Sequence, residues 1–146
     1  MAQTYSIHHR VEIEAAPEQL YSALSTQDGI ARWWTPMVKA QATVGTTAEI
    51  RFGDGKHGPD MRIDELIPNE RVAWTCQGGP WPGMRLVFSI QPHERGSVLV
   101  FDHDGWPEVS DFYRHCNTKW GFFLAVSLKG LLERGQGAPH PQDPSI

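Results

Sequence analysis

The sequence has few cysteines, no long apolar run and no apolar segment at its start. Its two cysteines, Cys76 and Cys116, do not make a disulfide framework, so a hydrophobic core must hold the fold. No stretch approaches the roughly 20 apolar residues that a membrane-spanning helix needs. The residues from Met1 to Glu14 also lack the apolar region of a secretory signal. We therefore expect a cytoplasmic location, with reduced thiols and no membrane span.

Clustered cations are also missing. The 13 Lys and Arg residues are scattered singly, and 17 Asp and Glu residues give the chain a formal net charge of −4. Binding to nucleic acid or to an anionic membrane surface depends on clustered cations, so we expect neither partner. His and Cys show no zinc-type spacing, and the segment 53–58 lacks the residues of a phosphate or calcium loop. We expect no metal and no cofactor, and no Gly-x-Ser-x-Gly motif marks a catalytic nucleophile.

Aromatic residues are abundant for a chain of 146 residues, with six Trp, six Phe and three Tyr. Such a set forms either a large aromatic core or the wall of an aromatic pocket, and composition does not separate the two. Hydrophobic residues make up 40% and charged residues 21%, which fits one globular domain. We place that domain at residues 1–135. The Pro-rich C-terminal tail, residues 136–146, is expected to be a loose surface arm.

Alternating apolar residues predict a half-buried strand over residues 5–15. Pro17 then opens a short helix, and Asp28 caps a second short helix that ends before Pro36. Further strands separated by turns are predicted from Ala48 to Phe52, from Met61 to the corner at Pro68, from Val72 to Cys76, from Met84 to Ile90, and from Leu99 to His103.

The end of the chain has helical spacing instead. From Tyr113 to Leu131 apolar residues recur every three or four positions, which predicts one long amphipathic helix between a cap at Ser110 and Gly135. Successive strands with tight turns indicate an antiparallel meander whose apolar face this helix covers. The predicted fold class is α+β. A curved antiparallel sheet of about six or seven strands wraps around one long C-terminal helix, with two short helices after the first strand.

Several segments in this order resemble a known family. They are Val11–Pro17 with Leu20–Leu24, Ala31–Pro36, Ile63–Pro68 with Arg71–Thr75, His103–Trp106, and the terminal helix from Trp120 to Gly135. The chain is similar to the START-like, helix-grip superfamily (SRPBCC, polyketide cyclase/dehydrase and lipid-transport proteins). Within it, the chain is nearest to the domain of activators of the heat-shock-protein-90 ATPase. This resemblance implies a deep, mostly apolar cavity for a small ligand between sheet and helix. It does not imply one chemistry, because members bind, carry, cyclise or modify different molecules.

Strand alternation and helical spacing predict which side chains face this cavity. The expected cavity residues are His9, Trp34, Ile63, Glu65, Trp74, Met84, Phe88, Phe101, His103, Trp106, Asn117, Trp120, Phe123 and Leu124. Four members of this set, His9, Glu65, His103 and Asn117, are polar on otherwise apolar faces. Each is either a hydrogen-bonded core group or a contact that orients a ligand. His103 is the favoured ligand contact, because it ends its strand beside Gly105 and Trp106, near where the cavity would open.

Three functional hypotheses follow. In the first, the chain binds or carries a small hydrophobic ligand, a class that includes aromatic molecules, without catalysis. Alternatively, it is an enzyme of the cyclase, dehydratase or hydrolase kind that uses His103 or Glu65 as acid or base. The third hypothesis is an interaction module linked to a chaperone or a stress regulator, although chaperone activators usually carry an additional domain for which we see no room. Trp81 and the other tryptophans near loops either plug the core or gate the cavity. Phe122 and Val126, on the far side of the last helix, contact the first helices or a second copy in a homodimer.

Overall fold

A computed structural model describes residues 3–146. One antiparallel sheet has the strand order β1-β7-β6-β5-β4-β3-β2. In chain order the elements are β1 (Tyr5–Ile13), α1 (Pro17–Ser25), α2 (Gln27–Trp33), β2 (Val38–Lys39), β3 (Thr47–Ile50), β4 (Asp60–Ile67), β5 (Arg71–Cys76), β6 (Arg85–His93), β7 (Gly96–Trp106), α3 (Asp111–Phe122), η1 (Phe123–Leu128) and α4 (Lys129–Arg134). The predicted α+β helix-grip fold is confirmed.

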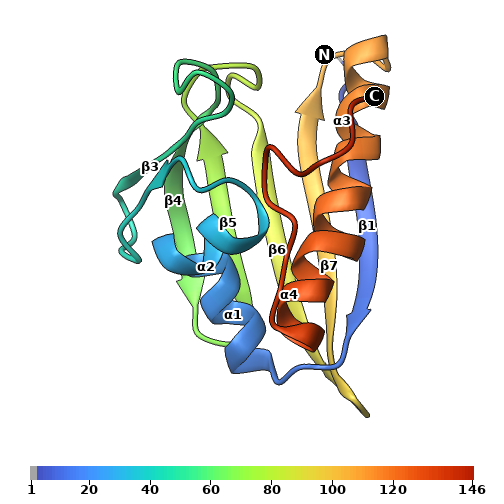
Figure 1. Ribbon diagram of the computed structural model, residues 1–146. Helices are drawn as coiled ribbons and strands as arrows, with labels where there is room; N and C mark the ends of the chain where they lie inside the picture. Colours follow the sequence, from blue (N-terminus) through green and yellow to red (C-terminus); the bar gives the residue numbers. More distant parts are fainter. Residues whose placement is uncertain (1–2) are drawn as a thin grey trace.

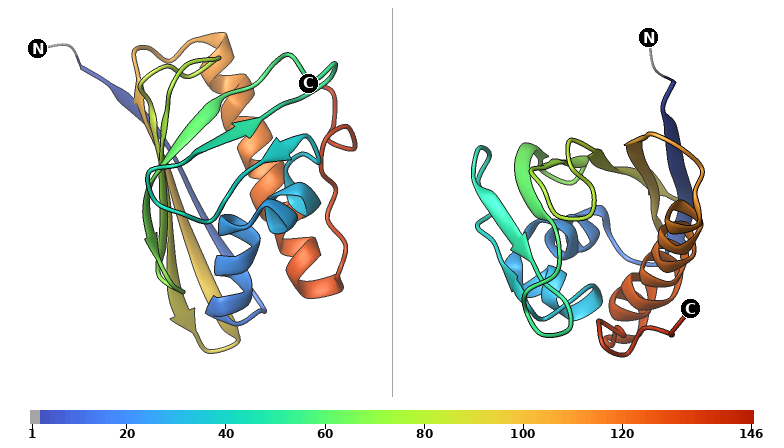
Figure 2. Two further views of the ribbon diagram at one scale, coloured as in Figure 1. Left: turned by 90° about the vertical axis from the view of Figure 1, so that its left-hand side faces the viewer. Right: turned by 90° about the horizontal axis from the view of Figure 1, so that it is seen from above.

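All helices lie on one face of the sheet. Figure 1 shows the C-terminal helix running along β1 and β7, while α1 and α2 lie in front of the middle strands. Seen from above, the sheet curves around the helices (Figure 2). The alternation in β1 produces this arrangement, because Ile7, Val11 and Ile13 are buried while His8 and Glu12 are exposed. Within residues 3–146 no helix is long and apolar enough to cross a membrane.

Two local details differ from the sequence predictions. The second helix is capped by Thr26, whose Oγ1 accepts a hydrogen bond from the Gly29 N–H at 3.0 Å, and not by Asp28. Asp28 lies inside the first turn, where its negative charge interacts favourably with the positive end of the helix dipole. A two-residue strand, β2, also pairs with the end of β3. It is too short to leave a pattern in the sequence.

The C-terminal helix is continuous, but η1, the six residues between α3 and α4, is wound as a π-helix. Its predicted ends are confirmed, because Ser110 Oγ accepts from the Tyr113 N–H and Gly135 adopts a left-handed φ of 79°. Ser127 lies in η1 and is fully buried. Ser127 Oγ donates to the Trp33 carbonyl at 2.6 Å and accepts from the Ala138 N–H at 2.8 Å. The hydroxyl therefore ties α2, the long helix and the chain beyond it together.

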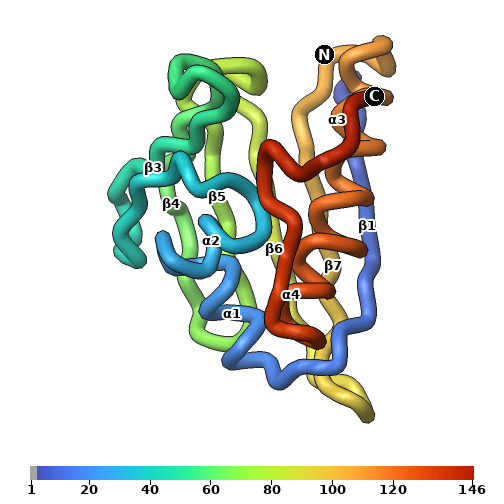
Figure 3. Tube along the Cα trace, in the orientation of Figure 1, coloured from blue at the N-terminus to red at the C-terminus, as the bar shows by residue number. Residues whose placement is uncertain are grey.

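The tail of residues 136–146 is not a loose arm. Figure 3 shows it turning back at the end of α4 and running along the molecule toward α3. The His140 N–H donates to the Trp34 carbonyl at 2.8 Å. Gly137 passes so close to α2 that a Cβ on it would lie 2.3 Å from the Arg32 carbonyl oxygen. Docking of the tail thus rests on backbone contacts between distant segments, which no local sequence pattern reveals.

Candidate functional site

The middle of the space between sheet and helix is filled by aromatic rings. Trp34 stacks on Trp74, with ring centroids 6.2 Å apart, and meets Trp120 at 5.0 Å. Phe101 lies 4.5 Å from Trp120 and 4.9 Å from Phe88. Ile63 and Leu124 belong to the same buried cluster. These predicted cavity residues therefore pack on one another. We call the aromatic members of this cluster, Trp34, Trp74, Phe88, Phe101 and Trp120, the pocket floor.

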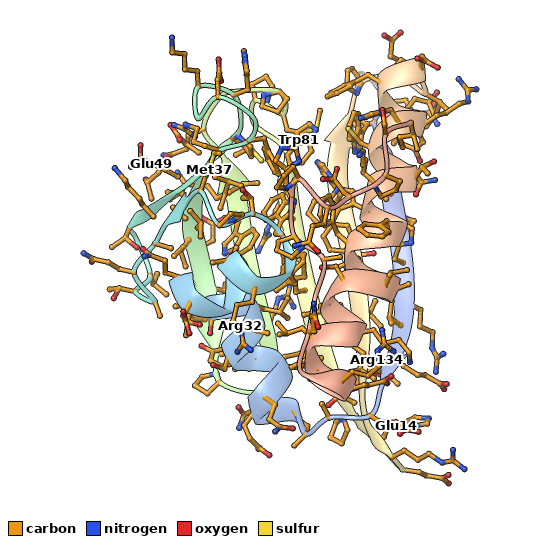
Figure 4. The ribbon with its side chains drawn as sticks, in the orientation of Figure 1. Glu14, Arg32, Met37, Glu49, Trp81 and Arg134 are labelled. Atoms are coloured by element: carbon orange, nitrogen blue, oxygen red, sulfur yellow. The ribbon has the colours of Figure 1, made fainter. Side chains whose placement is uncertain are left out.

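A pocket of about 480 Å³ opens above this floor. Its wall comes from α3, from the segment 52–59, from the loop after β5 and from the tail. The lining residues are Trp34, Phe52, His57, Gly58, Pro59, Pro80, Trp81, Phe112, His115, Cys116, Lys119, Trp120, Phe123, His140, Asp143, Ser145 and Ile146. In Figure 4 Trp81 is labelled between the strands and α3, near the upper end of the molecule. Among the described residues, no three His, Cys, Asp or Glu side chains converge to hold a metal ion.

Trp34, Trp120 and Phe123 are the predicted cavity residues that line this pocket. Sequence reasoning missed Phe112, His115 and Lys119 on α3. A signal for them was present, because they recur at three- and four-residue intervals alongside Cys116, Trp120 and Phe123. The tail residues could not be found in this way, since their place depends on how the chain folds back.

His103 lies next to the pocket, fully buried beneath Trp81. The Trp120 indole N–H donates to His103 Nδ1 at 3.1 Å. An indole nitrogen can only donate, so Nδ1 carries no proton and the imidazole proton is on Nε2. Burial lowers the pKa of His103 to about 3, and the ring is neutral at physiological pH. The predicted proton-transfer role would therefore have to work from a neutral imidazole.

Three buried N–H groups in this region have no oxygen or nitrogen acceptor among the described residues. They are His103 Nε2 and the indole nitrogens of Trp81 and Trp106. The rings are neighbours, with the His103 centroid 4.7 Å from Trp81 and 4.9 Å from Trp106. The Trp81 N–H lies toward the Cys116 thiol, whose pKa burial raises to about 11. Unpaired buried donors are costly, and in native proteins a water or ligand oxygen usually satisfies them.

Met84 and Trp106 lie at the same end of the sheet. Met84 is buried beside Gly105, where a Cβ would approach the Met84 backbone at 3.4 Å. Trp106 meets Phe112, a pocket residue, with ring centroids 5.8 Å apart. Neither residue lines the pocket, but the Met84 N–H donates to the carbonyl of the pocket residue Trp81 at 3.1 Å, so both predicted residues contact the pocket wall.

Glu65 does not face the interior, and this prediction is wrong. A bulge in β4 places Ile63 opposite Trp74 but Glu65 opposite Ala73, so one extra residue intervenes. A shift of one residue turns all following side chains to the other face of a sheet. Glu65 accordingly lies on the outer face, where its Oε2 is 2.7 Å from Arg71 Nε. His103 and Glu65 cannot form an acid–base pair.

Asn117 is also misplaced by the prediction. It is exposed, because Cys116 and Trp120 point inward and the next residue is rotated by about 100° around the helix. His9 does face the helix, but at a distance from the pocket. Its Cε1 would lie 3.7 Å from a Cβ at Gly121, an ordinary van der Waals distance, so the imidazole ring packs beside this turn of the helix.

A polar cluster closes the pocket on the side of the tail. Lys119 Nζ lies 2.5 Å from Asp143 Oδ2, and His140 Nδ1 lies 2.8 Å from Asp143 Oδ1. The Gly53 N–H donates to His140 Nε2 at 3.2 Å, so both ring nitrogens of His140 are in use. Burial alone would raise the pKa of Asp143, but the hydrogen bonds from Lys119 and His140 and the charge of Lys119 hold it below its usual value. The cluster therefore contains an ionised carboxylate and no free base.

The comparisons with known proteins agree with this architecture. Residues 14–133 match the family described as Activator of Hsp90 ATPase homolog 1-like protein. No curated protein sequence matches. A solution structure described as the Aha1 dimer from Colwellia psychrerythraea is 42% identical, with a TM-score of 0.83 over 91% of this chain and 99% of that one.

More distant structures show the fold alone. Protein SSP2350 from Staphylococcus saprophyticus is 18% identical, with a TM-score of 0.76 over 91% of this chain and 95% of its own. DynU16, described as a putative protein of the dynemicin biosynthetic locus, is 21% identical, with a TM-score of 0.71 over 90% of this chain and 48% of its own. The resemblance inferred from the motifs is confirmed: this chain belongs to the Activator of Hsp90 ATPase homolog 1-like family, within the SRPBCC superfamily.

Proposed function

We propose that the protein binds a small, hydrophobic, aromatic ligand in the pocket beside α3. The observation that carries the proposal is the pocket itself, which has a volume of about 480 Å³ and walls built largely from aromatic rings. Sites for small ligands are commonly concave, mostly apolar and of about this size. Proteins of this fold generally bind hydrophobic ligands. A flat ring system would stack on Trp34, Trp81 or Trp120 and lose its apolar surface to the pocket.

The unpaired donors support a ligand that also carries an oxygen acceptor. Trp81 lines the pocket and its ring lies 4.7 Å from that of His103, which does not line it. The N–H groups of His103 and of its neighbour Trp106 have no acceptor among the described residues. Rotation of the Trp81 side chain would open a path to both groups. Trp81 is then a gate, and His103 orients the ligand by donating from Nε2 while Trp120 holds the ring.

A titration tests the proposal. The panel is a flavonoid, a polyketide-like aromatic and a fatty acid, followed by tryptophan fluorescence and melting temperature. We expect saturable quenching and a melting temperature that rises with ligand concentration. Phe112→Ala removes an exposed pocket wall and should weaken binding about threefold to tenfold. Val126→Ala removes an equally exposed apolar side chain outside the pocket and should change nothing. Absence of saturable binding across the panel would contradict the proposal.

A second candidate function rests on the 42% identity to the Colwellia psychrerythraea protein. That relative is described as an Aha1 dimer, so we propose a homodimer and a contact with an Hsp90-type chaperone in the cytoplasm. Phe122 packs on the core, which leaves Val126 as the exposed residue of the pair considered for a dimer contact. Light scattering after size-exclusion chromatography would give the mass of the particle, and the ATPase rate of a bacterial Hsp90 would report the contact. A monomeric mass and an unchanged rate would contradict this candidate.

A further inference from the structure

Lys119 is the one permanent cation among the described residues that line the pocket. It stands on α3, one turn after His115 and directly before Trp120, and its side chain is 20% exposed. Its ammonium group therefore lies where aromatic wall and solvent meet. A cation in this position is suited to the charged end of a molecule whose apolar end enters the pocket.

The partner of Lys119 comes from the chain's own tail. Asp143 is 8% exposed and holds Lys119 through Oδ2, while the Pro144 carbonyl accepts a second hydrogen bond from the same ammonium group. The neighbouring tail residues Pro141, Gln142, Ser145 and Ile146 are exposed. Among the described residues, the hydrogen bonds that join residues 141–146 to the rest of the fold before the tail therefore go to Lys119.

The energetics of this contact favour exchange. A half-buried ion pair gains attraction but loses hydration, and the two nearly cancel. Removal of Asp143 alone would leave Lys119 without a counter-charge, which is unfavourable. Replacement of Asp143 by another carboxylate keeps the pair intact, and the apolar body of the incoming molecule adds contact with Trp120 and Phe112.

We propose that the natural ligand is an apolar monocarboxylic acid, and that residues 141–146 occupy its head-group position, with the Asp143 carboxylate in place of the ligand carboxylate on Lys119. This inference rests on the proposed function of the pocket. It adds the chemical class of the ligand and makes the tail a competitor that the acid must displace. An uncharged ligand of the same shape enters the pocket without displacing Asp143.

The test compares 1-naphthylacetate with its uncharged amide, 1-naphthylacetamide, by isothermal titration calorimetry. Asp143→Asn removes the competing carboxylate and should tighten binding of the acid about tenfold, with less than about a twofold change for the amide. Lys119→Met should reduce the affinity for the acid to that for the amide. The matched control is Glu133→Gln, because Glu133 pairs with Lys129 on the same helix at 3.1 Å, away from the pocket, and should change neither affinity.

Two further measurements separate displacement from unfolding. A full-length Asp143→Ala variant should bind the acid as tightly as Asp143→Asn, and the melting temperature of each variant reports whether it is folded. In amide NMR spectra of the wild type, the acid should shift the signals of Gln142 and Ser145 toward those of an unstructured peptide, whereas the amide should not.

The outcomes distinguish the two proposals. If both compounds bind but Asp143→Asn improves neither or improves both equally, the role of the tail is overturned and the pocket stands as a ligand site. If the acid binds with Gln142 and Ser145 unmoved, the displacement is overturned. If neither compound binds the wild type, Asp143→Asn or Asp143→Ala, both proposals are contradicted.

Discussion

Trp120 and His103 share a hydrogen bond that determines the state of both side chains. The indole N–H of Trp120 donates to His103 Nδ1 at 3.1 Å, and His103 is fully buried beside it. The bond fixes the Trp120 ring, which belongs to the pocket floor, to His103 in β7. It also leaves the imidazole neutral, with its remaining N–H unpaired.

Acid should destabilise the protein through His103. Burial lowers its pKa from 6.5 to about 3 in the folded chain. Above about pH 6.5 neither state is protonated, and the His103 contribution to stability is fully present. As the pH falls below that value, the unfolded chain takes up a proton that the folded chain refuses, so the free energy of unfolding decreases until about pH 3. Near pH 4.5 the loss is roughly 3 kcal/mol, because the pH lies about two units below the unfolded pKa.

Urea unfolding of the wild type and of His103→Gln at about pH 7 and pH 4.5 measures this loss. Glutamine keeps an acceptor for Trp120 but does not titrate, so the variant should lose less stability between the two pH values. The control is His57→Gln, whose side chain is 82% exposed and should behave as the wild type. Equal losses in the wild type and in His103→Gln would show that His103 does not resist protonation.

Removal of the Ser127 hydroxyl should loosen the tail. Its oxygen bonds both the Trp33 carbonyl and the Ala138 N–H, and these groups lose their partners in Ser127→Ala. We expect a loss of about 1–3 kcal/mol in the free energy of unfolding, together with faster proteolysis after Leu131. Thr118→Ala removes an exposed hydroxyl that bonds within α3 and should have little effect. Indistinguishable proteolysis of the two variants would mean that Ser127 does not hold the tail.

Two glycine substitutions near the same helix should act in opposite directions. Gly137→Ala puts a Cβ 2.3 Å from the Arg32 carbonyl, so the tail must shift and stability should fall by about 1–3 kcal/mol. Gly121→Ala meets only His9 Cε1 at 3.7 Å and should stabilise the helix by up to about 1 kcal/mol. Thermal unfolding of both variants measures the difference. A higher melting temperature for Gly137→Ala than for the wild type would contradict the close docking of the tail.

Glu65→Gln should leave ligand binding unchanged within about twofold, and stability within about 1 kcal/mol, because Glu65 pairs with Arg71 on the outer face of the sheet. Calorimetry with a pocket ligand and urea unfolding provide the two values. A large loss of binding would place Glu65 on the ligand side and refute the bulge in β4.

Much of the fold could be predicted because its signals are local. Alternation marked β1, and three- and four-residue spacing marked the long helix between Ser110 and Gly135. The site was predicted less well, because non-local geometry decides it. The bulge before Glu65 turns this side chain to the outer face of the sheet, although alternation had predicted the inner face. The second helix is capped by Thr26 and not by Asp28. The docked tail depends on contacts between segments far apart in the chain, such as that of His140 with Trp34.

The six tryptophans provide the most direct test of the pocket, because each indole N–H has its own NMR signal. The measurement is a titration of the protein with 1-naphthylacetamide, in which the indole signals are followed. We predict large shifts for Trp34, Trp81 and Trp120, which line the pocket. Trp33 should not shift, because its N–H donates to the Ala23 carbonyl at 2.8 Å within the core. Six unchanged signals, or a shift of Trp33 as large as that of Trp81, would contradict an aromatic ligand site at this position.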